Sequence, residues 1–354
     1  MRLELVKRSA EARFLVFASP FIAIAITVLV GAIFFAAIGV DPGRGVYVFF
    51  IEPISAWWSI EQLLAKATPL ILIGAGLSLC FLSNNWNIGA EGQFIAGALA
   101  GSILPVVFYQ FEGPLVLPLM LVMGFAGGAF YGLVPAALKT RFGASEILTS
   151  LMLVYIAQLF LDWMVRGPWR DPASFGFPKT RTFNDAAVVP TVGPFDIHAG
   201  LLIALVASII LFVFLKRTLK GFEVRISGTA PRAATFAGVS NRNMVLFVFA
   251  VSGGLAGLAG IIEVAGVAKK LQPVISPGYG FAAIIVAFLG RLNPLGVVFA
   301  ALLLALTYLG GEAAQLELNV TDKVTRVIQG VVLFAILACD TFILHRVRLV
   351  RRGK

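Results

Sequence analysis

Apolar runs long enough to cross a lipid bilayer recur along almost the whole chain. A transmembrane helix needs about 20 mainly apolar residues, and by that measure we predict ten membrane segments. The first follows four cations and exceeds the apolar core of a signal peptide, which is about 7–15 residues, so we expect it to be a retained span. The ten segments are residues 14–38, 62–83, 87–109, 114–138, 147–165, 198–215, 243–265, 278–290, 294–309 and 325–343.

The composition agrees with a chain that folds in a membrane. Hydrophobic residues make up 59% of the sequence and charged residues 13%, against about 25% charged in soluble domains. These values exclude a water-soluble core, and we predict an all-α, polytopic bundle of about ten transmembrane or re-entrant helices. The net charge of +10 comes from cations at the ends of apolar runs, which indicates membrane topology and not nucleic-acid binding.

The distribution of the cations predicts the orientation. With the N-terminus inside, 18 of the 28 Lys and Arg residues face the cytoplasm, as the positive-inside rule expects. We therefore predict a cytoplasmic segment at 1–13, a single membrane domain at 14–343 and a basic cytoplasmic tail at 344–354. The loop 166–199 is then external, and it is either a solvated connector or a contact for an external partner.

Two regions fit the ten-segment pattern poorly. Residues 278–290 and 294–309 are short for full crossings, so this pair could instead form re-entrant half-helices. Residues 83–92 are a polar interruption without Lys or Arg, and no charge fixes their side of the membrane. Their depth is left open.

The polar interruption and the residue after it hold five side chains that hydrocarbon does not tolerate. Burial without partners would cost each of them several kcal/mol, so they must face protein, backbone or water. They could line a translocation path, or they could cap a broken helix, with the acid stabilised at a helix N-terminus. The five are Asn84, Asn85, Asn87, Glu91 and Gln93.

A basic loop at residues 216–242 separates two apolar runs. It contains six cations and one anion, which favours the cytoplasmic side. Within it, Pro231 favours the start of a helix and Gly238 favours its end, which predicts roughly two helical turns of small residues. A short helix presented in this way is typical of a docking element.

Glycines recur at a spacing of four residues on three of the predicted spans. Small residues at this spacing let transmembrane helices approach closely. We expect tight helix packing at Gly97, Gly101, Gly124, Gly128, Gly132, Gly253 and Gly257.

Motifs of catalysis and nucleotide binding are missing from the sequence. It contains no G-x-x-x-x-G-K-[ST], no G-x-S-x-G and no H-E-x-x-H, so we predict neither a P-loop nor a catalytic residue. The two cysteines and two histidines are far apart, so we predict no metal site. The acids near the spans lie close to predicted ends, which disfavours the ion relay of a secondary carrier.

Three sequence blocks in this order resemble the membrane-spanning permeases of bacterial ABC importers. The likeness is to the branch of ribose-type sugar and branched-chain amino acid permeases, nearest to nucleoside and simple-sugar members that work with binding lipoproteins. The blocks are residues 87–94 (NIGAEGQF), residues 231–238 (PRAATFAG) with 252–260 (SGGLAGLAG), and residues 278–281 (GYGF) with 290–294 (GRLNP).

This resemblance implies a type II importer-like fold and a coupling helix that docks into an ATPase. The family's E-A-A-x-x-x-G pattern keeps its alanines and glycine here, but Arg232 stands where the acid would be. The coupling residues carried over are Pro231, Arg232, Ala233, Ala234 and Gly238.

The resemblance also implies a function and a set of partners. The chain would be a non-catalytic permease of the bacterial inner membrane that imports nucleosides or related simple sugars and binds no cofactor. ATP and Mg would sit on a partner ATPase, and the other partners would be a second, non-identical permease and a periplasmic or lipoprotein solute-binding protein. The alternative is a stand-alone carrier or channel, which has no need of the helix at 231–238.

Overall fold

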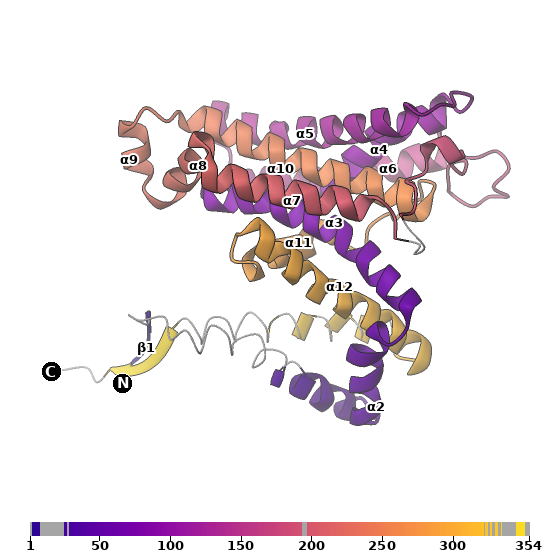
Figure 1. Cartoon of the computed structure of the whole chain (residues 1–354), viewed down its shortest axis with the longest axis horizontal. Coiled ribbons are helices and arrows are strands. Elements are labelled where there is room, and N and C mark those ends of the chain that lie inside the picture. Colours follow the sequence, from indigo (N-terminus) through magenta and orange to yellow (C-terminus); the bar gives the residue numbers. More distant parts are fainter. Residues whose placement is uncertain are drawn as a thin grey trace. The chain divides into compact units, whose positions relative to one another are not determined.

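The computed structural model is almost entirely helical (Figure 1). It describes residues 2–7, 25–26, 28–192, 197–321 and 345–350, with a few further positions between 323 and 334. Seven helices in these residues are long and apolar enough to cross a membrane, which confirms the prediction of a polytopic helical bundle. The chain divides into two compact units, residues 63–305 and a unit formed by residues 1–62 with 306–354.

The larger unit is a helical bundle with a hairpin of short helices at one end. Helices α3 and α12 each belong to both units. Its elements are α3 (Trp57–Leu82), α4 (Ala90–Val107), α5 (Val116–Phe142), α6 (Glu146–Arg166), η3 (Asp185–Ala187), α7 (Gly200–Arg217), α8 (Leu219–Thr229), α9 (Pro231–Phe236), α10 (Asn241–Glu263), η4 (Val264–Ala268), α11 (Tyr279–Leu289) and α12 (Pro294–Glu317).

Helices α3, α4 and α10 form the centre of this bundle. Between 67% and 83% of their most apolar windows is buried, against 22–28% for α5, α6 and α7. A helix that is apolar all round is stable only when protein or lipid surrounds it. The outer helices expose large apolar side chains such as Phe130, Leu159 and Ile210, so we assign their outer faces to lipid.

The smaller unit combines short helices with a two-stranded sheet. Its elements are α2 (Pro42–Val46), η1 (Tyr47–Ile51), η2 (Glu52–Ile54), β1 (Arg2–Lys7) and β2 (His345–Val350). The strands pair antiparallel, with Arg2 opposite Val350, so the two ends of the chain lie side by side. This pairing has no signal in the sequence.

The structure corrects one of the predicted segments. Residues 294–309 are not a short half-crossing, because α12 continues to Glu317 and has 24 residues. The apolar run ends before the helix does, since residues 312–317 (EAAQLE) are mostly polar residues and alanines, with one leucine, and all of these types favour a helix. Segment 278–290 is indeed short and forms the 11-residue α11.

Two other predicted segments are only partly covered. Segment 14–38 lies within the described residues only at 25–26 and from 28 onward, where residues 28–37 are helical, and most of segment 325–343 lies outside them.

The loop between α6 and α7 is fastened to the segment that follows α10. Backbone N–H groups of Thr180, Phe183 and Val189 donate to the carbonyls of Leu271, Lys269 and Ala265, at 3.0, 2.8 and 3.1 Å. The amide of Leu271 donates in turn to the Thr180 hydroxyl at 2.9 Å. We call residues 180–192 the strap. It is held in place by these bonds and is not a freely solvated connector.

A buried histidine paired with Thr191 of the strap predicts a pH dependence. His198 is 5% exposed, and neither of its ring nitrogens has a hydrogen-bond partner among the described residues. Burial lowers the pKa of His198 below its usual value. If opening of the strap exposes His198, the pKa of the imidazole returns toward its usual value, so His198 binds a proton more readily in the open state. The closed strap therefore loses stability as the pH falls below about 6.5.

Hydrogen exchange measures this effect through protection factors, which correct for the intrinsic pH dependence of exchange. We expect the protection of residues 180–192 to be lower at pH 5 than at pH 7.5, and the difference to be reduced in His198→Leu. Equal protection of the wild-type strap at both pH values would contradict the assignment.

Candidate coupling site

Helices α8 and α9 form a hairpin at one end of the larger unit (Figure 1). We call this end, with the connector 83–89 between α3 and α4, the coupling end. Helix α7 stops at Thr218, whose hydroxyl donates to the Phe214 carbonyl and accepts the amide of Gly221. Such capping satisfies a backbone donor at the start of α8. The turn from α7 into α8 is therefore fixed by local hydrogen bonds.

The far end of α8 lies directly against the end of α3. A methyl group at Gly228 would collide with the Leu82 carbonyl oxygen and would lie 3.3 Å from the Asn84 nitrogen. Only a residue without a side chain allows the two backbones to approach so closely. The end of α8 is therefore in direct backbone contact with the end of α3 and the start of the connector.

Helix α9 is the short helix that the sequence predicted between Pro231 and Gly238. Its end has the pattern of a Schellman motif. The Val239 amide donates to the Ala234 carbonyl at 3.0 Å, and Gly238 has φ +82°. Of the five predicted coupling residues, Ala234 is buried and anchors the helix, whereas Pro231, Arg232, Ala233 and Gly238 are exposed.

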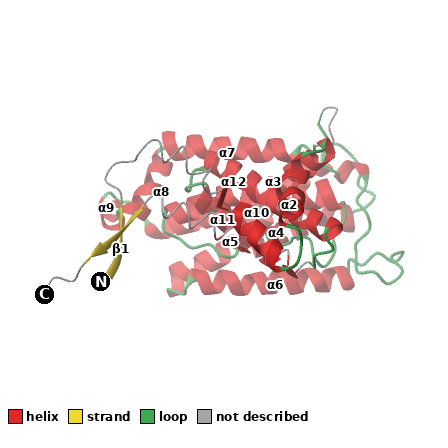
Figure 2. Cartoon of the chain, turned by 90° about the horizontal axis from the view of Figure 1, so that it is seen from below, coloured by secondary structure: helices red, strands yellow, loops and turns green. Residues whose placement is uncertain are grey.

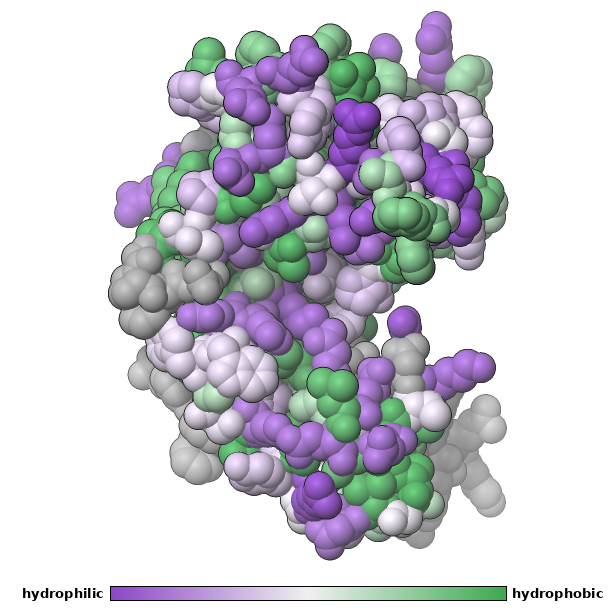
Figure 3. Space-filling model, turned by 90° about the vertical axis from the view of Figure 1, so that its right-hand side faces the viewer, coloured by the Kyte–Doolittle hydropathy of each residue, from purple (hydrophilic) through white to green (hydrophobic). Residues whose placement is uncertain are grey.

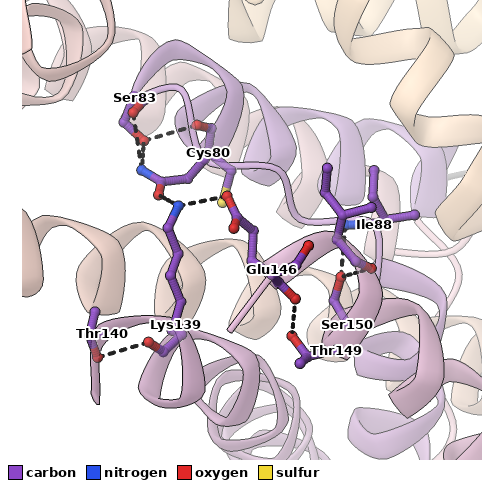
Figure 4. Close-up of polar contacts among 12 residues, drawn as sticks. Cys80, Ser83, Ile88, Lys139, Thr140, Glu146, Thr149 and Ser150 are labelled. Atoms are coloured by element: carbon purple, nitrogen blue, oxygen red, sulfur yellow. Dashed lines mark hydrogen bonds and ion pairs between the residues drawn. The ribbon is translucent and has the colours of Figure 1, made fainter. Parts of the chain in front are cut away.

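The connector is tied to α5 and α6 by one lysine (Figure 4). The Lys139 ammonium donates to the Asn85 side-chain oxygen at 2.8 Å and to Glu146 at 2.6 Å. The side chains of Lys139 and Glu146 are 26% and 14% exposed, so water screens this pair less than a surface pair. The same connector is held from α6 by Ser150, whose hydroxyl accepts the Ile88 amide at 3.3 Å.

The Lys139 ion pair gives a testable stability difference. Removing one partner of a fully buried pair costs about 3–5 kcal/mol, and partial exposure reduces that cost, so we expect Lys139→Met to lose roughly 1–3 kcal/mol. Thermal unfolding in detergent measures the loss, and Arg141→Met, at an exposed position on the same helix, is the matched control. Adding Glu146→Leu to Lys139→Met should recover part of the loss. Equal unfolding of Lys139→Met and the control would contradict the account.

The buried amides of the connector and α4 satisfy one another. Asn87 and Gln93 exchange two hydrogen bonds of 2.9 and 3.0 Å. Asn87 also donates to the Ser252 hydroxyl of α10 at 3.1 Å and accepts the Gly89 amide. Both side chains are almost fully buried, so in this conformation they face protein groups. They lock the start of α4 to the middle of α10.

Glu91, in the first turn of α4, holds the start of α11. Its carboxylate accepts the Gly280 amide at 2.6 Å and is 2% exposed. A carboxylate at a helix N-terminus is stabilised by the unpaired amides there. Asn84 differs from the other four predicted path residues because it is exposed and has φ +57°.

The predicted packing glycines are brought together in the bundle. Helices α5 and α10 touch backbone to backbone, since a methyl group at Gly128 would lie 2.6 Å from the Gly257 Cα. A methyl group at Gly97 of α4 would collide with the same Gly257, and one at Gly132 would lie 2.7 Å from the Phe249 carbonyl oxygen. The remaining predicted glycines meet neighbours at similarly short range: Gly101, Gly124 and Gly253.

Two residues of the coupling end were missed from the sequence. Gly228 could have been found from the sequence. A glycine inside a helix lowers helix stability by about 1 kcal/mol relative to alanine, so its presence suggests close packing against a neighbour. Phe236 is 94% exposed on α9, and an aromatic residue within a polar loop was the signal there.

Comparison with known proteins agrees with this architecture. The family described as branched-chain amino acid transport system, permease component, matches residues 59–337. The glucose ABC transporter permease protein TsgB13 of Haloferax volcanii is 33% identical over 366 residues, which cover 100% of this chain and 96% of that protein.

Two relatives come from Bacillus subtilis and carry the same transporter name. The guanosine ABC transporter permease protein NupP is 29% identical over 89% of this chain and 91% of its own length. The guanosine ABC transporter permease protein NupQ is 28% identical over 69% of this chain and 78% of its own length.

The match defines the class of the protein. The chain belongs to the branched-chain amino acid transport system permease family and is a non-catalytic, multi-pass membrane subunit of an ABC importer. The resemblance found in its motifs is confirmed, and the stand-alone carrier is set aside.

Proposed function

We propose that this permease imports nucleosides or related simple sugars. Its relatives are named for glucose and for guanosine, two solutes that share a polar sugar ring. The described spans contain no cluster of three or more His, Cys, Asp or Glu residues that could hold a metal ion, and a neutral, hydroxyl-rich solute requires none. We propose that the chain itself binds no cofactor.

The α8–α9 hairpin is the surface that we propose for the partner ATPase. Arg232, Ala233 and Phe236 are exposed on one short helix, which offers an aromatic anchor beside small residues and a cation. A cavity of about 420 Å³ lined by Glu223, Met244 and Phe247 among others separates α8 from the start of α10. The hairpin therefore has room on that side to move when the ATPase pushes on it.

The contact between Gly228 and Leu82 carries the mechanism that we propose. Closure of the ATPases on ATP would press α9 and α8 against the connector. The connector is bonded to α5 through Lys139 and to α10 through Asn87, so the push reaches helices that surround the translocation path. In this account Asn84, Asn85, Asn87, Glu91 and Gln93 shape the wall of that path and hold its helices in register.

The cations favour one orientation. Lys139, Arg141, Lys216, Arg217 and Arg242 all belong to the coupling end or its adjoining helix termini. By the positive-inside rule we propose that this end is cytoplasmic and that the strap is external. For both chain termini we propose the cytoplasmic side from the cation distribution of the sequence.

We propose a second, non-identical permease and a solute-binding lipoprotein or periplasmic protein as the other partners. NupP and NupQ are two different permease proteins of one organism with the same transporter name, which is the pattern of paired subunits. ATP and Mg would then be bound on the ATPase.

Uptake by intact cells tests the solute. Cells that lack this gene should lose uptake of radiolabelled guanosine or of glucose at nanomolar to micromolar concentration, and the gene should restore it. Unchanged uptake of guanosine, adenosine, ribose and glucose would contradict the proposed substrate class, and the family assignment would stand.

A further inference from the structure

The tip of the loop between α6 and α7, residues 170–177, is a preformed turn. The Asp171 amide donates to the Lys179 carbonyl at 2.9 Å and closes the loop, and the Asp171 carboxylate accepts the Ala173 amide at 3.0 Å. Two further backbone bonds join Ser174 to Asp171 and Phe177 to Ser174. The tip therefore has a defined shape, and the strap fastens its base to the bundle.

This turn holds an aromatic side chain out into the solvent. Phe175 is 98% exposed and Phe177 is 71% exposed. Phe175 also has φ +48°, a conformation that is uncommon for residues other than glycine and that clusters at functional sites. The turn is ordered and keeps a phenylalanine exposed despite an unfavourable backbone conformation. This combination is typical of a contact site.

The tip points away from the lipid-facing sides of the bundle. Figures 1 and 2 both show this loop extending beyond the helix ends, at the opposite end of the larger unit from α8 and α9. A membrane-interface anchor would instead lie beside the helix ends, where aromatic belts are found. The position favours a partner in the aqueous phase.

Exposed cations lie on the same loop as the two phenylalanines. One more lies on the segment after α10, to which the strap is hydrogen-bonded. Arg170, Arg181 and Lys269 are exposed, and Arg181 lies over the Tyr109 ring at 5.7 Å from its centroid. The Asp171 carboxylate is already engaged in the turn. Figure 3, which views this end, shows hydrophilic side chains with hydrophobic ones set among them.

We propose that the tip is the docking element for the solute-binding protein, with Phe175 inserted into an apolar pocket and Arg170, Arg181 and Lys269 paired with carboxylates on an acidic rim. This inference rests on the proposed orientation and partners, and it adds the surface and the chemistry of the contact. Buried aromatic anchors supply most of the affinity of such contacts, and complementary charges speed association and set the register.

Site-specific photocrosslinking in intact cells tests the docking element. A benzophenone side chain at position 175 should crosslink to an exported solute-binding protein, identified by mass spectrometry. Arg170→Glu should reduce that crosslink about tenfold or more, the loss expected for a hot-spot contact. Arg141→Glu, the same substitution at an exposed position near the end of α5 and outside the α8–α9 hairpin, should leave the crosslink unchanged.

Crosslinks from position 175 only to lipid or to a second permease copy, or none at all, would overturn the proposal. So would a crosslink to the binding protein that Arg170→Glu leaves intact. The same photocrosslinker at position 236 of α9 separates the two proposals, because contact with an ATPase there shows that the importer account holds even if the tip has no partner.

Discussion

Gly228→Ala uncouples the transporter while the permease still inserts and assembles. In a free helix this substitution would stabilise α8 by about 1 kcal/mol. Here the added methyl collides with the Leu82 carbonyl, and overpacking of this kind costs about 1–3 kcal/mol, or roughly 5- to 150-fold in a coupled equilibrium. We expect solute-stimulated ATPase activity and uptake in nanodiscs or cells to fall by that factor.

The control for Gly228→Ala is Gly330→Ala, the same substitution at an exposed helical position where nothing lies within 4 Å of the added methyl group. It adds the same methyl group without a collision, so uptake should remain near the wild-type rate. Wild-type uptake in both variants would show that the α8–α3 contact does not transmit the ATPase movement.

Asn87→Leu destabilises the whole bundle. The substitution leaves the Gln93 amide and the Ser252 hydroxyl without their partner, and it removes the acceptor for the Gly89 amide. Each buried group left unsatisfied costs about 1–3 kcal/mol. With three groups affected, we expect a loss of at least about 3 kcal/mol in unfolding free energy, measured by thermal denaturation of the purified permease in detergent.

Asn84→Gly is the control for Asn87→Leu. It removes an exposed amide from the same connector and keeps the left-handed backbone, which glycine tolerates. Its thermal stability should be unchanged. If Asn87→Leu were equally stable but altered solute uptake, Asn87 would contact solute and would not hold α4 to α10.

The sequence was sufficient to predict the helical bundle because hydropathy responds directly to the lipid environment. Segments such as 62–83 and 147–165 correspond closely to α3 and α6. Two elements differ from the prediction in polar stretches: α8 is a separate helix within the predicted loop, and α12 continues beyond the predicted end of its segment. Hydropathy does not record helix formation in water, so those elements were read as loop or as a shorter segment.

The candidate site was only partly predictable. The short helix α9 at Pro231–Phe236 follows from proline and glycine chemistry, which is local. The bonds from Lys139 to Asn85 and from Asn87 to Ser252 join residues 54 and 165 positions apart. No local pattern encodes such pairs, and the sequence therefore left the polar patch open between a path and a structural role.

Contact between α9 and the ATPase is the measurement that tests the account most directly. A photocrosslinking residue at Phe236, which is 94% exposed, would be introduced into the tagged permease and activated in intact cells, with position 175 as the comparison site at the opposite end. We expect position 236 to crosslink to an ATP-binding cassette subunit and position 175 not to do so. The crosslink from position 236 should be weaker when ATP is depleted, and also when Gly228→Ala displaces the hairpin. An ATPase that co-purifies with the permease but never crosslinks at position 236 would contradict the account.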